Sequence, residues 1–156
     1  MLHNQVKSNF IKILGKNNVL DKDYETRRFS TGWRTGYGKV SFVLLPNNLI
    51  EMWKAIEIAV ENDMILIFQA ANTGLTGGST PYGDYDRNVV LINTSKLKKI
   101  HYLKNKKQVV CMPGSTLHEL ENILEPFSRQ PHSVLGSSCI GASVIGGVCN
   151  NSGGSL

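Results

Sequence analysis

Apolar residues recur at helical spacing in three segments of the chain, residues 4–14, 48–60 and 116–124. Within each segment they return every three or four positions, which gathers them on one face of a helix. Gly15 follows the first segment and is typical of a residue that ends a helix. The pattern therefore predicts three amphipathic helices. Residues 142–148, small and apolar, predict a fourth and shorter one.

Two of these helices carry a recognisable start signal. Asn48 precedes the second helix and Thr116 precedes the third, and both residue types are good N-caps. A glutamate follows three positions later in each case, at Glu51 and Glu119, which is the spacing of a capping box. We therefore expect each side-chain pair to satisfy free N–H groups at a helix start.

Short apolar runs at residues 40–45, 64–68 and 88–92 predict strands. The run at 64–68 contains no polar residue, as expected of a parallel strand that is covered on both sides. Strand, helix and strand over residues 40–68 form a predicted βαβ unit with parallel, right-handed connectivity. Residues 21–38 show no such period and include three glycines, so we expect them to be irregular.

Residues 100–103 and 109–112 predict a β-hairpin around a lysine-rich turn at 104–107. A lysine-rich turn is usually a solvated tip or a guarded sheet edge. The net charge of +5 also permits attraction to phosphate groups. No base-recognition motif accompanies it, so we expect no nucleic-acid partner and favour an anionic membrane surface.

Composition narrows the class of protein. The chain has 156 residues, of which 41% are apolar and 19% charged, as in one soluble globular domain. No apolar run is long enough to span a membrane, and the first residues do not read as a secretory signal. A reducing compartment is therefore the default expectation. The three cysteines are an odd number and form no C-x-x-C pair, and the histidines show no metal spacing.

Residues 70–79, A-A-N-T-G-L-T-G-G-S, follow a predicted parallel strand, where α/β proteins bind ligands. Glycines allow backbone N–H groups to converge on an anion, and we expect Gly74 to need a positive φ. The loop matches neither a Walker motif nor the nicotinamide G-x-G-x-x-G. Two interpretations of the loop remain open: a phosphate cradle made of neutral donors, or an ordinary glycine-rich turn.

Residues 136–154 read G-S-S-C-I-G-A-S-V-I-G-G-V-C-N-N-S-G-G. Glycine, serine and alanine leave room for a flat or charged group to touch the backbone. Together with A-N-T-G-L-T-G-G-S at 71–79, this segment resembles the FAD-binding segments of the vanillyl-alcohol-oxidase/PCMH flavoprotein superfamily. Within it, the sequence is most similar to the bacterial respiratory, quinone-dependent D-lactate dehydrogenase family. The resemblance extends to residues 29–38, 79–87 and 131–138.

The resemblance implies an α+β, PCMH-type FAD-binding fold. A small parallel βαβ subdomain would be followed by the start of a mixed or antiparallel β subdomain with helices. It also implies FAD as cofactor, bound non-covalently because residues 70–79 contain no His, Cys or Tyr; Cys139 and Cys149 are the residues that could contradict this. The implied cofactor-binding residues are Ala70, Ala71, Asn72, Thr73, Gly74, Gly78 and Ser79 from the first segment, and Gly136, Ser143 and Gly153 from the second.

Members of this family oxidise D-lactate to pyruvate and pass the electrons through FAD to quinone. They are peripheral on the cytoplasmic face of the inner membrane and several times longer than this chain. Residues 1–156 would form the N-terminal portion of the FAD-binding domain, without the substrate and membrane parts, and would be inactive alone. Catalytic residues cannot be assigned: neither His132 as a base nor Arg34 as a carboxylate clamp has visible partners. Another 2-hydroxy acid such as glycolate, or a non-catalytic nucleotide-binding module, remains an alternative.

Overall fold

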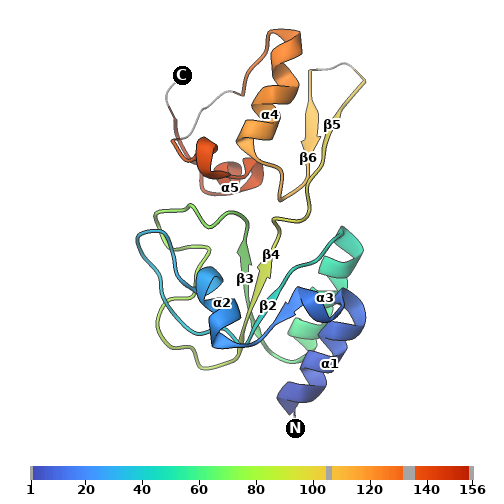
Figure 1. Ribbon diagram of the computed structural model, residues 1–156, viewed down its shortest axis with the longest axis vertical. Coiled ribbons are helices and arrows are strands. Elements are labelled where there is room, and N and C mark those ends of the chain that lie inside the picture. Colours follow the sequence, from blue (N-terminus) through green and yellow to red (C-terminus); the bar gives the residue numbers. More distant parts are fainter. Residues whose placement is uncertain (1, 105–106, 132–135, 155–156) are drawn as a thin grey trace. The chain divides into compact units, whose positions relative to one another are not determined.

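The structure is a computed structural model that describes residues 2–104, 107–131 and 136–154 (Figure 1). The chain divides into two compact units, Met1–Lys96 and Leu97–Leu156. Each unit has its own set of helices and strands, and each is described by itself.

The first unit contains a four-stranded sheet in the order β1-β2-β4-β3. Strand β1 is antiparallel to β2, whereas β2, β4 and β3 are mutually parallel. Its elements are α1 (Leu2–Leu14), a 3₁₀ turn (Lys16–Asn18), β1 (Val19–Leu20), α2 (Asp23–Ser30), β2 (Phe42–Leu44), α3 (Leu49–Glu61), β3 (Ile65–Gln69) and β4 (Val89–Asn93).

Both faces of this sheet are covered by helices. Helices α1 and α3 lie side by side (Figure 1) and pack on the face that carries Phe42 and Val90. Helix α2 places Phe29 against the opposite face, beside Val43 and Leu91. Because side chains alternate along a strand, neighbouring residues of β2 and β4 enter these two separate clusters.

The predicted βαβ unit is present, with one difference in sheet order. Strands β2 and β3 run parallel as expected, but β4 lies between them and pairs with both. All five residues of β4 are buried, whereas β3 lies at the edge of the sheet and leaves Phe68 48% exposed. The expectation that residues 64–68 form a strand covered on both sides holds in part, because Leu66 packs on the cluster of one face and Ile67 on that of the other, whereas Phe68 is exposed. An apolar run cannot by itself distinguish a central strand from an edge strand.

The expectation that residues 21–38 are irregular was wrong for Asp23–Ser30, which form α2, and is confirmed for residues 31–38, which belong to no helix or strand. This helix buries Thr26, Phe29 and Ser30, a face with only one large apolar residue, so its hydrophobic period is weak. Acidic residues in its first turn and Arg27 and Arg28 in its last suit the helix dipole. That charge order is the signal from which the helix could have been predicted.

The second unit contains the predicted hairpin, with β5 (Ile100–Tyr102) antiparallel to β6 (Val109–Cys111). Helix α4 (Leu117–Leu124) follows, then 3₁₀ turns at Glu125–Phe127 and Ser138–Ile140, and finally α5 (Val144–Cys149). The short helix predicted at 142–148 is thus present and begins two residues later.

The two predicted capping boxes differ. At α4 both halves form: Thr116 accepts from the Glu119 N–H, and the Glu119 carboxylate accepts from the Thr116 N–H at 2.8 Å. At α3, Asn48 accepts from the Glu51 N–H at 2.9 Å, but the Glu51 carboxylate takes the N–H of Asn47 instead. Only half of the predicted capping box at Asn48 is therefore present.

Candidate functional site

The loop at residues 70–79 leaves the carboxyl end of β3, at the edge of the parallel sheet where α/β proteins bind ligands. Positive φ values occur at Asn72 (57°) and Gly77 (76°). Gly74 has no positive φ, and a Cβ placed on it would meet nothing within 4 Å. The expectation that Gly74 needs a left-handed conformation was therefore wrong. Its lack of a side chain leaves open space beside the backbone.

Backbone N–H groups in this loop are available to a ligand. Among the described residues of the first unit, none of the N–H groups of residues 71–79 has a hydrogen-bond acceptor. The only backbone bond that closes the loop runs from the Thr80 N–H to the Gly77 carbonyl, at 3.2 Å. Residues 70–79 contain no charged side chain, so nothing within the loop opposes an anion. These properties fit the pyrophosphate of FAD.

Two of the predicted cofactor residues use their side chains within the protein. Asn72 donates from Nδ2 to the Thr31 carbonyl at 2.8 Å. Ser79 donates from Oγ to Asn72 Oδ1 at 3.1 Å. Their side chains therefore shape the loop, and their backbone N–H groups are what they offer to a cofactor.

Residues 29–38, part of the resemblance but without an assigned role, pack directly on the loop at residues 70–79. Thr35 donates from Oγ1 to the Leu75 carbonyl at 3.1 Å. Gly36 has a φ of 92°, and a Cβ on it would lie 2.3 Å from Thr80 Oγ1. Glycine is thus required where the two loops meet. The glycines at 32, 36 and 38 were the sequence signal that could have predicted this close approach of residues 29–38 to Thr80.

Sequence reasoning also missed the two buried amides Gln69 and Asn93, at the ends of β3 and β4, which are 3% and 2% exposed. Gln69 Nε2 donates to the Ser79 carbonyl at 2.8 Å. A polar residue that closes an otherwise apolar strand was the signal that could have found them.

The second predicted segment lies in the second unit. Gly136 and Gly153 are exposed, and a Cβ on either would meet nothing within 4 Å. Ser143 is buried and caps α5, because its Oγ accepts from the Gly146 N–H at 3.0 Å. Ser138 Oγ is buried without a hydrogen-bond partner in the described part of the chain. An unsatisfied hydroxyl in a cofactor-binding segment fits a ligand contact.

This segment is tied to the start of α4. The Leu117 N–H donates to the Ala142 carbonyl and the Val144 N–H to the Ser115 carbonyl, both at 2.9 Å. Thr116 and Ser143 form an isolated antiparallel bridge between these two bonds. Each predicted segment is therefore organised within its own unit.

The residues considered for covalent or catalytic chemistry lie as follows. Cys139 and Cys149 are exposed. Burial raises the pKa of the half-buried Cys111 thiol. Arg34 is exposed in the segment that packs on the loop at residues 70–79, and His132 lies outside the described residues. Within the described ranges, no group of three or more His, Cys, Asp or Glu side chains could hold a metal ion.

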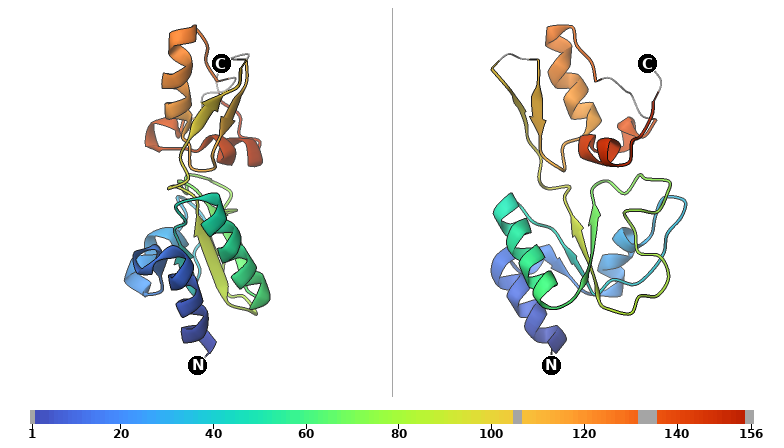
Figure 2. Two further views of the ribbon diagram at one scale, coloured as in Figure 1. Left: turned by 90° about the vertical axis from the view of Figure 1, so that its right-hand side faces the viewer. Right: turned by 180° about the vertical axis from the view of Figure 1, so that it is seen from behind.

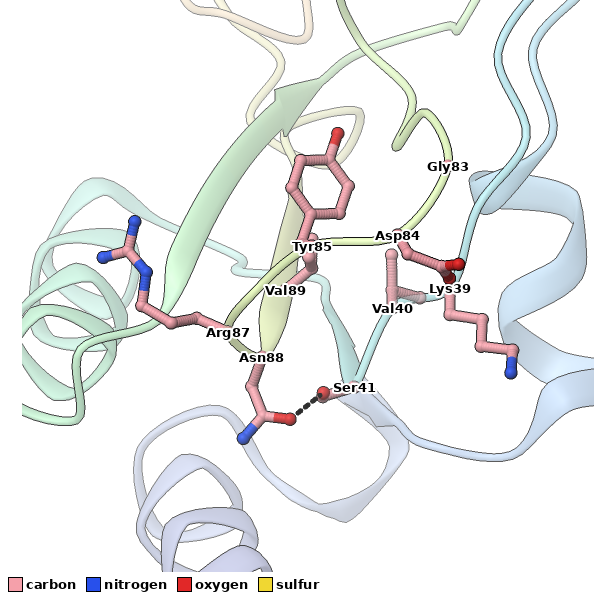
Figure 3. Close-up of a pocket in the computed structure, with 9 residues that line it drawn as sticks. All are labelled: Lys39, Val40, Ser41, Gly83, Asp84, Tyr85, Arg87, Asn88 and Val89. Atoms are coloured by element: carbon pink, nitrogen blue, oxygen red, sulfur yellow. Dashed lines mark hydrogen bonds between the residues drawn. The ribbon is translucent and has the colours of Figure 1, made fainter.

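A cleft of about 300 Å³ lies elsewhere in the first unit, lined in part by Lys39, Tyr85 and Arg87 (Figure 3). It opens at the amino ends of β2 and β4, the opposite edge of the sheet from residues 70–79. Arg87 pairs with Asp63 at 2.8 Å and Asp86 at 3.3 Å, and these carboxylates raise the pKa of its guanidinium. The charge of Arg87 is therefore already balanced by two carboxylates.

Comparison with known proteins shows a match to a family model described as an FAD binding domain, over residues 40–156. The chain is 54% identical to the quinone-dependent D-lactate dehydrogenase of Haemophilus influenzae, over 97% of the chain and 27% of that protein. It is 52% identical to the enzyme of the same name from Escherichia coli, over 93% of the chain and 26% of that protein. The chain thus spans about a quarter of the length of these curated relatives.

The chain is also similar to more distant relatives and to solved structures. The mitochondrial D-2-hydroxyglutarate dehydrogenase of Arabidopsis thaliana is 32% identical over 94% of the chain and 26% of that protein. Among solved structures, p-cresol methylhydroxylase superposes with a TM-score of 0.74 at 17% identity, over 93% of this chain and 28% of that one. Alkyldihydroxyacetonephosphate synthase superposes with a TM-score of 0.77 at 16% identity, over 94% and 30%. At these identities the structural matches establish the fold alone, which is the predicted α+β fold.

Proposed function

The chain belongs to the FAD binding domain family, and we propose that it forms the FAD-binding part of a quinone-dependent D-lactate dehydrogenase. The observation that carries this proposal is the identity of 54% and 52% to two enzymes of that name across nearly the whole chain. Residues 1–156 form the N-terminal portion of a PCMH-type FAD-binding domain in this proposal. The complete enzyme oxidises D-lactate to pyruvate and passes the electrons to quinone.

FAD supplies the redox chemistry, and the residues of this chain bind and orient it. The backbone N–H groups of residues 71–79 would hold the pyrophosphate. Gly74 and Gly78 leave space for the phosphate oxygens, since a Cβ on either is free of close contacts in the protein. Within the second unit, Gly136, Ser143 and Gly153 are the residues that would contact the cofactor. Binding is non-covalent.

A second candidate is oxidation of a different 2-hydroxy acid. The 32% identity to a D-2-hydroxyglutarate dehydrogenase favours it over a module without enzymatic activity. The substrate is therefore to be settled by assays of the complete enzyme with D-lactate and D-2-hydroxyglutarate side by side.

Association with a membrane surface is a separate part of the proposal. No helix in the described part of the chain is long and apolar enough to cross a membrane. Lys99 and Lys104 of the hairpin region are exposed and are suited to anionic headgroups. We propose that the complete enzyme is a peripheral protein at the cytoplasmic face of the inner membrane. Co-sedimentation with anionic and neutral vesicles checks this, and equal binding to both would count against the lysine surface.

The test of the cofactor site is Gly74→Val, read by FAD fluorescence titration beside thermal melting. Because Gly74 has neither a positive φ nor close neighbours, the variant should fold with stability unchanged to within about 0.5 kcal/mol. Its branched side chain fills the space beside the phosphate, so FAD affinity should fall by at least about tenfold. Ser79→Ala keeps every backbone N–H and should cost less. Unchanged FAD affinity in a folded Gly74→Val protein contradicts the phosphate cradle.

A further inference from the structure

Two buried side-chain amides lie at the carboxyl ends of β3 and β4, next to the loop at residues 70–79, called the cofactor loop below. Gln69 and Asn93 are register partners in the parallel pairing of β3 with β4, and they are the last residues of these strands. Both are almost wholly inaccessible to solvent. A buried amide is costly unless its donors and acceptors are all paired, so the partners of these two side chains explain what the pair is for.

The two side chains bond to each other and to three separate stretches of backbone. Gln69 Nε2 donates to the Phe29 carbonyl and to the Ser79 carbonyl, each at 2.8 Å. Asn93 Nδ2 donates to Gln69 Oε1 at 3.1 Å and to the Ala70 carbonyl at 2.9 Å. All four amide N–H groups of the pair are therefore used.

These partners mark the two ends of the cofactor loop. Ala70 is its first residue and Ser79 its last, so the pair holds both ends of residues 70–79 against the sheet. Phe29 lies at the start of residues 29–38, which pack on the same loop. Among the described residues, the Thr80–Gly77 bond is the one backbone bond that closes the loop. Its shape therefore depends on side-chain contacts, of which those of Gln69 and Asn93 hold its two ends. An apolar pair here would pack as well but would leave three carbonyls without donors.

We propose that Gln69, held in place by Asn93, is a positioning residue that fixes the loop at residues 70–79 in the form that receives the FAD pyrophosphate. This inference rests on the proposed function. It adds that the N–H groups are aimed before the cofactor arrives, so that binding does not have to order ten residues of chain. Loops ordered in advance bind more tightly because that entropy cost is already met.

The experiment uses the 156-residue chain and compares Gln69→Met with Val6→Ala. Met has nearly the shape of Gln but donates no hydrogen bond. Val6 is buried on α1 in the core cluster of the other sheet face, so its truncation lowers stability without touching the loop. Each protein is titrated with FAD and with riboflavin, which lacks the pyrophosphate, and is melted in parallel. Amide ¹H–¹⁵N spectra without cofactor report the loop directly.

We expect Gln69→Met to weaken FAD binding by about tenfold or more, to leave riboflavin binding unchanged and to shift the amide signals of residues 71–79. Val6→Ala should lower the melting temperature and keep parental FAD affinity. Asn93→Ser, which replaces the amide by a shorter hydroxyl and loses the reach to Ala70, should give a smaller loss in the same direction. It also serves as the second probe if Gln69→Met does not fold.

The outcomes separate the two proposals. If Gln69→Met and Asn93→Ser bind FAD as Val6→Ala does, while Gly74→Val binds weakly, the positioning role is overturned and the cofactor site stands. If the parent chain binds riboflavin as well as FAD, or binds neither, the pyrophosphate cradle fails and the positioning role fails with it.

Discussion

The two glycine-rich segments share one sequence signal, yet they are built in different ways. The loop at 70–79 follows a sheet whose central strand β4 is buried at all five positions, and its ends are held by buried side chains. The segment at 136–154 bonds to residues 115–117, and its helix α5 contains no buried residue. Richness in glycine thus predicts an open backbone in both places. How firmly that backbone is held depends on the neighbouring elements, which Figure 2 shows for each unit from two further sides.

The largest expected loss of stability comes from truncating a buried side chain in the core of each unit, and it should be greater in the first unit. Phe42 is 1% exposed and contacts the rings of His3 and Phe10, so Phe42→Ala should cost about 3–5 kcal/mol. Leu120→Ala removes a residue of α4 that is 6% exposed and should cost about 2–3 kcal/mol. Denaturant titration, with hydrogen exchange measured on peptides from each unit, assigns the loss. Equal losses in both units would remove the contrast drawn above.

A smaller effect is expected from adding one methyl group to a glycine in each unit. A Cβ on Gly32 would lie 1.9 Å from the Thr35 carbonyl oxygen, so Gly32→Ala should cost about 2–3 kcal/mol. Gly136→Ala meets nothing within 4 Å and should change stability by less than about 0.5 kcal/mol. Thermal melting of both variants checks this. A marked loss for Gly136→Ala would show that the second segment is held more tightly than its contacts indicate.

The start of α4 supports the second segment, and its cap can be removed. Thr116→Ala eliminates the side-chain acceptor for the Glu119 N–H and should cost about 1 kcal/mol. Hydrogen exchange should rise at the Leu117 and Val144 amides, which join this start to residues 142–144. Thr116→Ser keeps the hydroxyl and serves as the control. Exchange that rises only within α4 would show that the segment does not depend on the cap.

The smallest effect concerns pH. The N–H of Thr116, and to a lesser extent Lys98, hold the pKa of Glu119 below its ordinary value. A carboxylate with a lowered pKa in the folded state stabilises the protein above its unfolded-state pKa, and this contribution is lost as the pH falls through the folded-state pKa. Melting temperatures of the parent should therefore fall more steeply than those of Glu119→Gln as the pH is lowered from 5 toward 3. Parallel curves would show that the Glu119 charge contributes nothing to folding.

Much of this protein follows from local sequence. The helices at α1, α3 and α4, the parallel strands, the lysine-rich hairpin and the capping box at Thr116 are confirmed, because each rests on periodicity or on contacts within a few residues. The same reasoning predicts a ligand loop after β3, since a glycine-rich run beyond a parallel strand is a local pattern, and its role in binding stays a prediction. The family resemblance, confirmed by the match to the FAD binding domain, added the cofactor.

Other features were decided only by tertiary structure. Strand β4 lies between β2 and β3, and Phe68 is left at an edge, because sheet order depends on packing between residues far apart in the chain. Helix α2 has a local charge order that favours a helix, but the packing of its Phe29 on Val43 and Leu91 is a tertiary contact. The positive φ belongs to Asn72 and Gly77 rather than to Gly74, since contacts with residues 29–38 set the path of the loop. The donors of Gln69 and Asn93 meet carbonyls up to 40 positions away in the chain, a pairing that no local pattern encodes.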